Sequence, residues 1–261
     1  MPYNYNHMKM SYRSMLDPLK ERFFSKELTC MPITVGKMYG QSPVRLMYVG
    51  RAVNGWNEDW QEGTTEQLVE QVFEHTQDMS VITKGVVEYM SDGKLCKYNY
   101  NRSPFWQLCR ELMKQYGVER DWADYIAWTN LFKVSYSKTG NPNGMLISET
   151  ISDCADILFY EIFCERPTHI VFVTDEWWLK PSGLKLNGNN INESVFLETL
   201  GLNADMDASK IIIGSGVAGN EYFCYPGSPR PKYVITKRPE SAKMSRTEHA
   251  KAIHDAFSDL S

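Results

Sequence analysis

Three short segments, far apart in the chain, each pass abruptly from an apolar run into polar residues. They span residues 44–56, 128–134 and 233–241. The apolar and β-branched part of each is typical of a buried strand, and the glycine, asparagine, proline or charge that follows marks the end of that strand. In an open α/β sheet, ligands bind at the carboxyl ends of the strands. We therefore expect the three transitions to meet at one edge of a sheet and to form a ligand site.

Expected strands alternate with expected helices along the chain. The strands are residues 44–49, 125–134, 169–174, 211–213 and 232–236. The helix signals are an amphipathic stretch over residues 8–26, capping boxes at Thr64 and Ser245, a Ser103-Pro104 helix start, and apolar residues at helical spacing over residues 147–162. This alternation predicts an α/β protein, a three-layer α/β/α sandwich with a mainly parallel central sheet. Residues 79–102 have a weaker signal, and we interpret them as an insertion or a long loop.

Length and composition set the limits of this prediction. The chain has 261 residues, which fits one large α/β domain, although length alone allows two. Hydrophobic residues make up 43% and charged residues 23%, which argues against a disordered or fibrous protein. We predict a single domain over residues 1–261, with an N-terminal helical extension over about residues 1–40.

The charge of the chain excludes a general attraction to polyanions. The formal net charge is −4, so binding to nucleic acid requires a local basic patch. Residues 226–246 form the one candidate, because they carry six basic residues against the single acid Glu240. The basic residues are Arg230, Lys232, Lys237, Arg238, Lys243 and Arg246. A solvated loop with a chance positive bias is the alternative.

Other classes of site lack their sequence signals. The six cysteines form no C-x-x-C pair, there is no H-E-x-x-H, and His249 and His254 are five residues apart, so we expect buried thiols and no metal site. Residues 214–219 spell G-x-G-x-x-G, but prolines follow and no helical period does, so we interpret them as a glycine-rich loop and expect no cofactor. No signal peptide and no apolar run of roughly 18 residues occurs, which predicts a cytoplasmic protein without membrane contact.

The combination and order of the three opening segments resemble the uracil-DNA glycosylase superfamily. Residues 50–55 correspond to the family's first motif, which shapes the water site, and Asn130 corresponds to the asparagine that recognises the base. Residues 236–241 correspond to its late histidine-proline motif. The resemblance covers roughly residues 44–257. It implies a uracil-DNA glycosylase-like fold, DNA or a nucleotide as partner, and a DNA repair hydrolase that cleaves the N-glycosidic bond of an altered base.

The departures from the family fall on the chemistry. Arg51 and Ala52 stand where the family places an acid or an amide that positions water, and Arg238 stands in place of the histidine that donates to the departing base. No arrangement of four cysteines for an iron–sulfur cluster is present. The resemblance therefore supports the fold more strongly than the activity.

A glycosylase site needs a donor near the base and an acceptor for water, because cleavage leaves negative charge on the base and positive charge on the sugar. Arg238 supplies a permanent positive charge, although it is a poor proton donor. Glu58 and Asp59 are the nearest carboxylates that can orient water, and a solvated acidic turn is the alternative for them. These three residues are the predicted catalytic groups.

Two further groups of residues are predicted to bind. Asn130 offers the carbonyl and amide that a pyrimidine edge requires, with a capped turn as its alternative, while Trp56 or Phe105 stacks on the base or belongs to the core. The predicted substrate-binding residues are Gly50, Arg51, Asn54, Trp56, Phe105, Asn130 and Lys133. The predicted nucleic-acid-binding residues are Lys237, Arg238, Ser241, Lys243 and Met244, the last as an apolar wedge.

Three functions remain open from the sequence. The first is a DNA glycosylase without a cofactor. The second is a non-catalytic nucleotide- or DNA-binding protein that has lost the water-positioning residue. The third is a hydrolase of small nucleoside-like metabolites.

Overall fold

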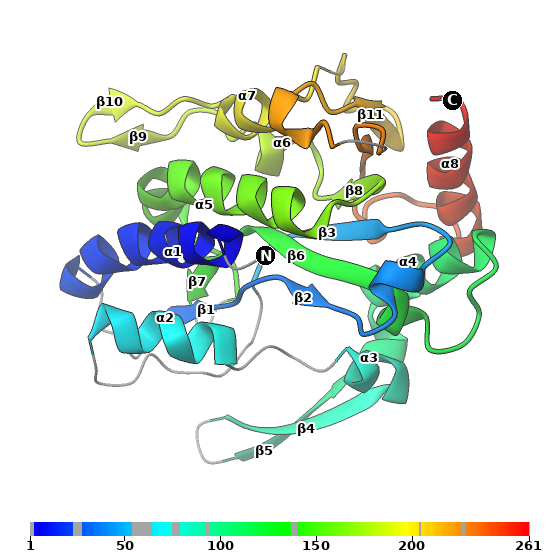
Figure 1. Cartoon of the computed structure of the whole chain (residues 1–261), viewed down its shortest axis with the longest axis horizontal. Coiled ribbons are helices and arrows are strands. Elements are labelled where there is room, and N and C mark those ends of the chain that lie inside the picture. Colours follow the sequence, from blue (N-terminus) through cyan, green and yellow to red (C-terminus); the bar gives the residue numbers. More distant parts are fainter. Residues whose placement is uncertain are drawn as a thin grey trace.

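The structure is a computed structural model that describes residues 3–22, 28–53, 64–74, 79–91, 94–136, 140–203, 205–225 and 228–260. Its centre is a six-stranded sheet in the order β11-β12-β8-β3-β6-β2 (Figure 1). The strands are β11 (Ile212–Val217), β12 (Lys232–Thr236), β8 (His169–Val173), β3 (Leu46–Ala52), β6 (Ile126–Phe132) and β2 (Thr34–Val35).

The four inner strands of this sheet run parallel. β12 pairs with β8, β8 with β3 and β3 with β6 in parallel, while β11 and β2 pair antiparallel at the two edges. The prediction of a mainly parallel central sheet is therefore confirmed. The strands at 44–49, 125–134, 169–174 and 232–236 were predicted to within a few residues.

Helices cover both faces of the sheet. One face packs on α1 (Tyr3–Arg22), α5 (Gly144–Glu165) and α7 (Val195–Leu200), and the other on α4 (Pro104–Gln115) and α8 (Arg246–Ser258). Alternate residues of β3 pack against the two helical layers. Met47 and Val49 face α5, whereas Leu46 and Tyr48 face α4. The arrangement is that of an α/β/α sandwich.

The helix boundaries follow from local capping. Thr64 and Gln67 exchange hydrogen bonds at the start of α2 (Thr65–Glu74), and Ser245 and Glu248 form a capping box on α8, as the sequence predicts. Pro104 opens α4, and Gly117, with a φ of +78°, follows its end.

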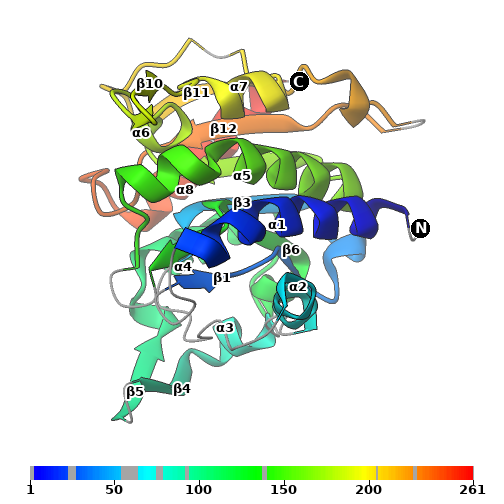
Figure 2. The same cartoon turned by 90° about the vertical axis from the view of Figure 1, so that its left-hand side faces the viewer.

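The N-terminal helix packs beside α5 and α2 on one face of the sheet. The helix α1 was expected over residues 8–26 and spans Tyr3–Arg22; residues 23–27 lie outside the described part. It buries Met8, Tyr12, Met15, Leu16 and Leu19 and lies beside α5 in Figures 1 and 2.

Two segments differ from their predictions. Residues 79–102, predicted as an insertion or a long loop, hold α3 (Ser80–Lys84) and a hairpin of β4 (Val86–Ser91) and β5 (Lys94–Asn99) that projects from the body as an insertion does, so the loop alternative is wrong (Figures 1 and 2). The glycine-rich residues 214–217 are not a loop either, because they pair with β12 as part of β11. A Cβ at Gly216 would lie 2.7 Å from the hydroxyl of Tyr233, so glycine lets this edge strand pack against that ring.

Short elements make up the rest of the described secondary structure. They are β1 (Leu28–Cys30) paired with β7 (Val134–Tyr136), β9 (Lys185–Leu186) paired with β10 (Asn189–Asn190), and the short helix α6 (Glu176–Leu179). Single 3-10 turns occur at Tyr39–Gln41, Tyr100–Arg102, Trp122–Tyr125 and Glu221–Phe223.

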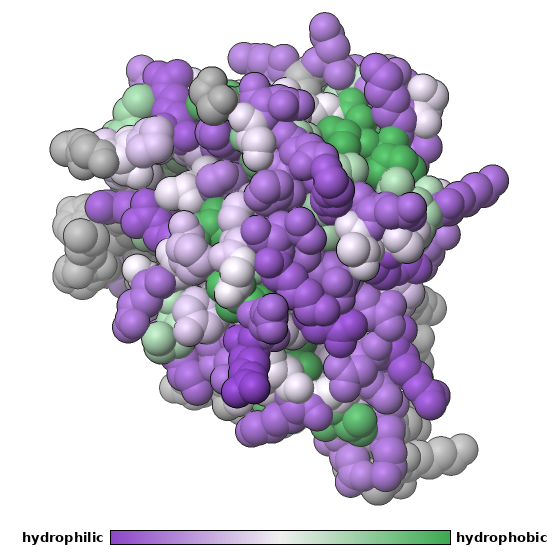
Figure 3. Space-filling view, turned by 90° about the vertical axis from the view of Figure 1, so that its right-hand side faces the viewer, coloured by the Kyte–Doolittle hydropathy of each residue, from purple (hydrophilic) through white to green (hydrophobic). Residues whose placement is uncertain are grey.

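The surface of the protein is largely polar. The face on the right of Figure 1, which includes α8, carries mostly hydrophilic side chains with a hydrophobic patch near its upper edge (Figure 3). Within the described ranges no helix has the length and apolar character to cross a bilayer, and no group of three potential metal ligands occurs. Cys109 and Cys154 are buried free thiols as predicted, but Cys224 is exposed.

Candidate ligand site at the carboxyl edge of the sheet

The carboxyl ends of β6, β3, β8 and β12 lie at one edge of the sheet because the four strands are parallel. Gly50 on β3 is the register partner of Asn130 on β6, and Thr236 at the end of β12 is the partner of Val173 at the end of β8. The three transitions predicted from the sequence therefore share an edge. A fourth transition, from β8 into α6, joins them there.

Asn130 is held between β3 and the start of α4. The two-residue period of β6 puts Asn130 on the same face as Trp128, towards α4. A Cβ at position 50 would lie 2.4 Å from Oδ1 of Asn130 and 3.3 Å from Cζ of Phe105. Glycine at position 50 therefore leaves the space that the asparagine side chain occupies, and the structure brings Gly50, Asn130 and Phe105 together.

The Phe105 ring is fixed by its neighbours. Tyr48 donates a hydrogen bond from its hydroxyl to the carbonyl of Phe105 (2.8 Å), and the two ring centroids lie 4.6 Å apart. Burial raises the pKa of Tyr48, so this hydroxyl stays a neutral donor. Phe105 as a whole is only partly buried.

Arg51 lies on the opposite face of β3 from Gly50. Its guanidinium sits over the ring of Trp178, with 5.1 Å to the centroid, and that ring packs in turn on Phe132 (5.9 Å). The buried Nε of Arg51 has no hydrogen-bond partner, and no carboxylate of the described residues lies within ion-pair distance of it. Burial, and then the charge of Arg238, lowers the pKa of Arg51. Asp175 and Glu240 lie near enough to oppose this lowering, but within the described residues the Arg51 guanidinium forms no ion pair, which favours an anionic ligand.

Arg238 differs from Arg51 because it already has a carboxylate partner. Its Nε and Nη2 atoms bind both oxygens of Glu240, at 3.1 and 2.8 Å. Burial disfavours the charged form of Glu240, but the hydrogen bonds from Arg238, together with the positive charges of Arg238 and of the more distant Arg51, outweigh burial and lower the pKa of Glu240. The Arg238–Glu240 pair is neutral overall, so Arg51 is the stronger candidate for binding an anion.

Asp175 ties the end of β8 to the segment after β12. Its Oδ1 accepts a hydrogen bond from the backbone N–H of Arg238 (3.0 Å) and lies 3.3 Å from the hydroxyl of Ser241, whose single proton is shared between this oxygen and the carbonyl of Arg238 (3.0 Å). Asp175 has a φ of +62°, a strained value for a residue other than glycine. The helix α6 and the orange-red segment after β12 accordingly lie side by side at the left of Figure 2.

Sequence reasoning missed Asp175, although a signal for it was present. Residues 169–175 pass from an apolar strand into Thr174 and Asp175, which is the same change that identified the other three segments. The strand was predicted, but its carboxyl end was not considered as part of the site. A search for every such strand end would have found it.

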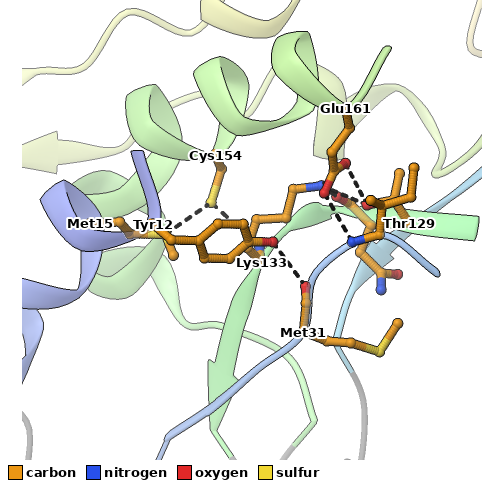
Figure 4. A network of polar contacts seen from close by, with 9 residues as sticks. Tyr12, Met15, Met31, Thr129, Lys133, Cys154 and Glu161 are labelled. Atoms are coloured by element: carbon orange, nitrogen blue, oxygen red, sulfur yellow. Dashed lines mark hydrogen bonds and ion pairs between the residues drawn. The ribbon is translucent and has the colours of Figure 1, made fainter. Parts of the chain in front are cut away.

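Lys133 was predicted to bind substrate, and the structure places it elsewhere. Two-residue periodicity puts Thr129 and Lys133 on the α5 face, opposite to the side chain of Asn130. The side chains of Lys133 and Glu161 are fully buried and form an ion pair (2.6 Å), as Figure 4 shows.

All three protons of the Lys133 ammonium have acceptors. Nζ donates to Glu161 Oε2 (2.6 Å), Thr129 Oγ1 (2.7 Å) and the backbone carbonyl of Asn130 (2.6 Å), while Glu161 Oε1 accepts from the N–H of Ile33 (3.2 Å). An ammonium with three acceptors has no proton left for a ligand. Lys133 therefore fixes the backbone of Asn130 and does not contact a ligand at the edge.

The predicted nucleic-acid-binding residues lie on the segment after β12. Lys237 donates to the carbonyl of Ser209 (3.2 Å), Ser241 bonds Asp175, Lys243 is exposed with a φ of +51°, and Met244 is half-buried. The wedge role of Met244 stays a prediction.

Four predicted residues fall outside the described part of the chain. They are Asn54 and Trp56, expected to bind substrate, and Glu58 and Asp59, expected to orient water.

Comparison of the sequence with models of known protein families and with curated proteins found no match.

Proposed function

We propose that the carboxyl edge of the sheet binds a nucleotide, in keeping with the resemblance to uracil-DNA glycosylases. The observation that carries the proposal is the pairing of two features at one edge. They are an asparagine amide held against Gly50 and Phe105, and an arginine on the same strand as Gly50 that forms no ion pair within the described residues. The amide recognises a base, and the arginine binds a phosphate.

Asn130 suits recognition of a base edge. Its side chain offers one acceptor and two donor protons, the complement of a pyrimidine edge, and no hydrogen bond within the described residues engages them. Lys133 holds the backbone carbonyl of Asn130 on one side, and Gly50 leaves room for the side chain on the other. The accessible part of Phe105 supplies a ring on which a base stacks.

Arg51 suits recognition of a phosphate. A guanidinium presents paired N–H donors that match phosphate oxygens, and it binds them more strongly where water is partly excluded. The ring of Trp178 supports the guanidinium of Arg51 from one side, which leaves its N–H edges for the ligand.

A second proposal is hydrolysis of an N-glycosidic bond, and Asp175 favours it. Its carboxylate lies at the same edge, and within the described residues its Oδ2 accepts no hydrogen bond, so this oxygen is free to orient a water molecule. Arg51, whose guanidinium forms no ion pair within the described residues, supplies the positive charge that stabilises negative charge on a departing base. Glu58 and Asp59 remain the alternative water-positioning groups.

Calorimetry with nucleosides and nucleoside monophosphates tests the binding proposal. Arg51→Ala should weaken monophosphate binding more than about tenfold, by loss of one charge-assisted contact, and leave nucleoside binding unchanged. Asn130→Ala should weaken both ligands. Arg120→Ala and Asn189→Ala, at exposed positions away from the edge, are the matched controls. Binding that is unaffected by both site variants would contradict the proposal.

Base release tests the hydrolysis proposal. Duplexes that contain uracil, hypoxanthine or a mismatch should yield alkali-labile abasic sites, and free nucleosides should yield free base if the substrate is a metabolite. Asp175→Asn should abolish the product if Asp175 orients water. Product formation that survives this change would move that role to Glu58 or Asp59, and no product from any substrate would leave binding alone.

A further inference from the structure

Trp177 exposes an indole ring beside the candidate site. It lies on α6, two residues after Asp175, and 41% of its surface is exposed. Large aromatic side chains at a surface are enriched where a protein binds a partner, because their burial removes much apolar area from water. Neither the base recognition by Asn130 nor the phosphate binding by Arg51 uses this ring.

The exposed ring is joined to Arg51 by direct contacts. Trp177 meets Trp178 edge to face, with 5.2 Å between centroids, and the ring of Trp178 lies under the guanidinium of Arg51 at 5.1 Å. Trp178 faces inward against Phe132. Trp177 is therefore the outermost of three side chains in contact, which run from Arg51 through Trp178 to the surface.

The backbone that carries Trp177 is firmly held. The N–H of Asp175 donates to the carbonyl of Thr236 (3.3 Å), and its carboxylate binds Arg238 and Ser241. Leu179, at the other end of α6, is fully buried. The strained φ of Asp175 persists because these contacts determine the backbone there, and strain of this kind is found at binding sites. An exposed ring on a fixed backbone loses little freedom when a ligand stacks on it.

Resting on the proposed function, we propose that the ligand is a single-stranded polynucleotide and that Trp177 stacks on the base next to the one at Asn130. Every base has a π-face, so stacking of this kind adds affinity without requiring a particular sequence. Arg51 follows Gly50, the register partner of Asn130, and contacts Trp177 through Trp178, so its guanidinium is the cation available to the phosphate that links the two nucleotides. In a duplex both faces of each base are already covered, so Trp177 gains its contact only from an unpaired strand.

Affinity measured against ligand length tests this inference. Single-stranded hexanucleotides of each base, six-base-pair duplexes whose strands are joined by a covalent linker so that they stay paired, and nucleoside monophosphates are compared by fluorescence anisotropy and calorimetry. The hexanucleotide of the preferred base should bind at least about tenfold more tightly than its monophosphate and than the duplex. Trp177→Ala should weaken hexanucleotide binding about 5- to 100-fold and leave monophosphate binding unchanged.

Two variants control the result. Trp177→Phe keeps a smaller ring and should lose less affinity than the alanine variant, whereas Tyr222→Ala removes another exposed aromatic residue, 61% exposed on the 3-10 turn Glu221–Phe223, and should lose none. Unchanged monophosphate binding shows that a variant is folded.

The outcomes separate this inference from the proposed function. If the Trp177→Ala protein binds hexanucleotides as tightly as the wild type, or if duplexes bind as well as single strands, the inference is wrong while monophosphate binding through Asn130 and Arg51 stands. If the wild type binds neither monophosphates nor hexanucleotides, the proposed function fails and the inference fails with it.

Discussion

At the scale of single residues, the site depends on pairs of residues in which one partner sets the position of the other. Gly50 and Asn130 are register partners on β3 and β6, and the space left by the glycine is the space that the asparagine fills. Glycine within a strand usually weakens it, so a close approach of another group is the physical reason for its place here.

Gly50→Ala tests this pair. The new Cβ would meet Oδ1 of Asn130 at 2.4 Å, so the asparagine side chain must rotate away. We expect nucleotide affinity to fall more than about tenfold, with a stability loss of only about 1–3 kcal/mol from local overpacking. Calorimetric titration and urea denaturation measure the two effects. Gly40→Ala, where a Cβ meets nothing within 4 Å, is the control, and unchanged affinity in Gly50→Ala would contradict the assigned role.

Lys133 and Glu161 form the second pair. A buried ion pair is costly to break because the remaining charge is left without a partner. Burial already raises the pKa of Glu161, and the contact with Lys133 opposes that rise. The pair is therefore expected to matter more for the orientation of Asn130 than for net stability.

Lys133→Met should destabilise the protein by about 3–5 kcal/mol, because it leaves Glu161 buried and unpaired. The double change Lys133→Met with Glu161→Leu should recover most of that loss while still weakening nucleotide binding, since the carbonyl of Asn130 has lost its donor. Denaturant unfolding and ligand titration of both variants give the comparison. Lys84→Met, at an exposed position, should change neither. Equal stability of the single and double variants would refute the account.

At the scale of elements, β12 and α8 are joined by a buried hydrogen bond between Thr236 and His249. Thr236 Oγ1 donates to the carbonyl of Ile211 (2.9 Å), so the contact with His249 Nε2 (2.6 Å) requires the imidazole to donate. The proton therefore lies on Nε2, and Nδ1 is buried without a partner. Burial, and then the charge of Arg246, lowers the pKa of His249 to about 4.

This pKa predicts how stability depends on pH. The imidazole in the unfolded chain takes up a proton below about pH 6.5, while the folded protein resists until about pH 4, so stability is complete above pH 6.5 and falls between these values. His249 should contribute a loss of about 3 kcal/mol at most by pH 4. His169, whose pKa burial also lowers to about 4, acts in the same direction.

His249→Gln isolates the contribution of this residue, because an amide still donates to Thr236 but does not titrate. The difference in unfolding free energy between wild type and variant should shrink or reverse as the pH falls from 7 to 4, measured by urea denaturation at each pH. His169 is present in both proteins and cancels. A difference that stays constant over this range would show that the pKa of His249 is not lowered.

At the scale of the whole molecule, any local positive charge that binds an anion is opposed by the negative net charge of the protein. The net charge is −4, so binding of an anion depends on Arg51 and its immediate surroundings rather than on a general field. Arg238 is balanced by Glu240, and Lys237 donates to a backbone carbonyl. Few phosphate contacts are therefore expected.

The salt dependence of binding should be correspondingly weak. With one or two phosphates neutralised, the logarithm of the hexanucleotide affinity should fall with the logarithm of salt concentration at a slope of about −1. Arg51→Ala should make that slope shallower by about 0.7, the value for one phosphate on a single strand. Anisotropy titrations between 50 mM and 300 mM salt measure both. A slope several times steeper would require a broad basic face, which this model of the site does not include.

Local patterns in the sequence predicted most of the helices and strands of the central fold. Buried strands, capping boxes at Thr64 and Ser245, and the stop at Gly117 depend on near neighbours in the chain, so the alternation of strands and helices and the parallel sheet could be predicted. The sequence also indicated that Asn130 and Lys133 point to opposite faces of the sheet, since residues an odd number of positions apart on a strand have side chains on opposite faces.

Only the tertiary structure decided how those elements meet. Three features depend on which groups packing brings together. They are the ion pair of Lys133 with Glu161, 28 residues away, the unpartnered Nε of Arg51 among the described residues, and the hydrogen bond that Asp175 accepts from the segment after β12. The same is true of residues 214–217, which form a strand because β12 supplies their hydrogen-bond partners. Local sequence sets the periodicity and the ends of elements, whereas contacts between distant residues decide which charges are paired and which remain for a ligand.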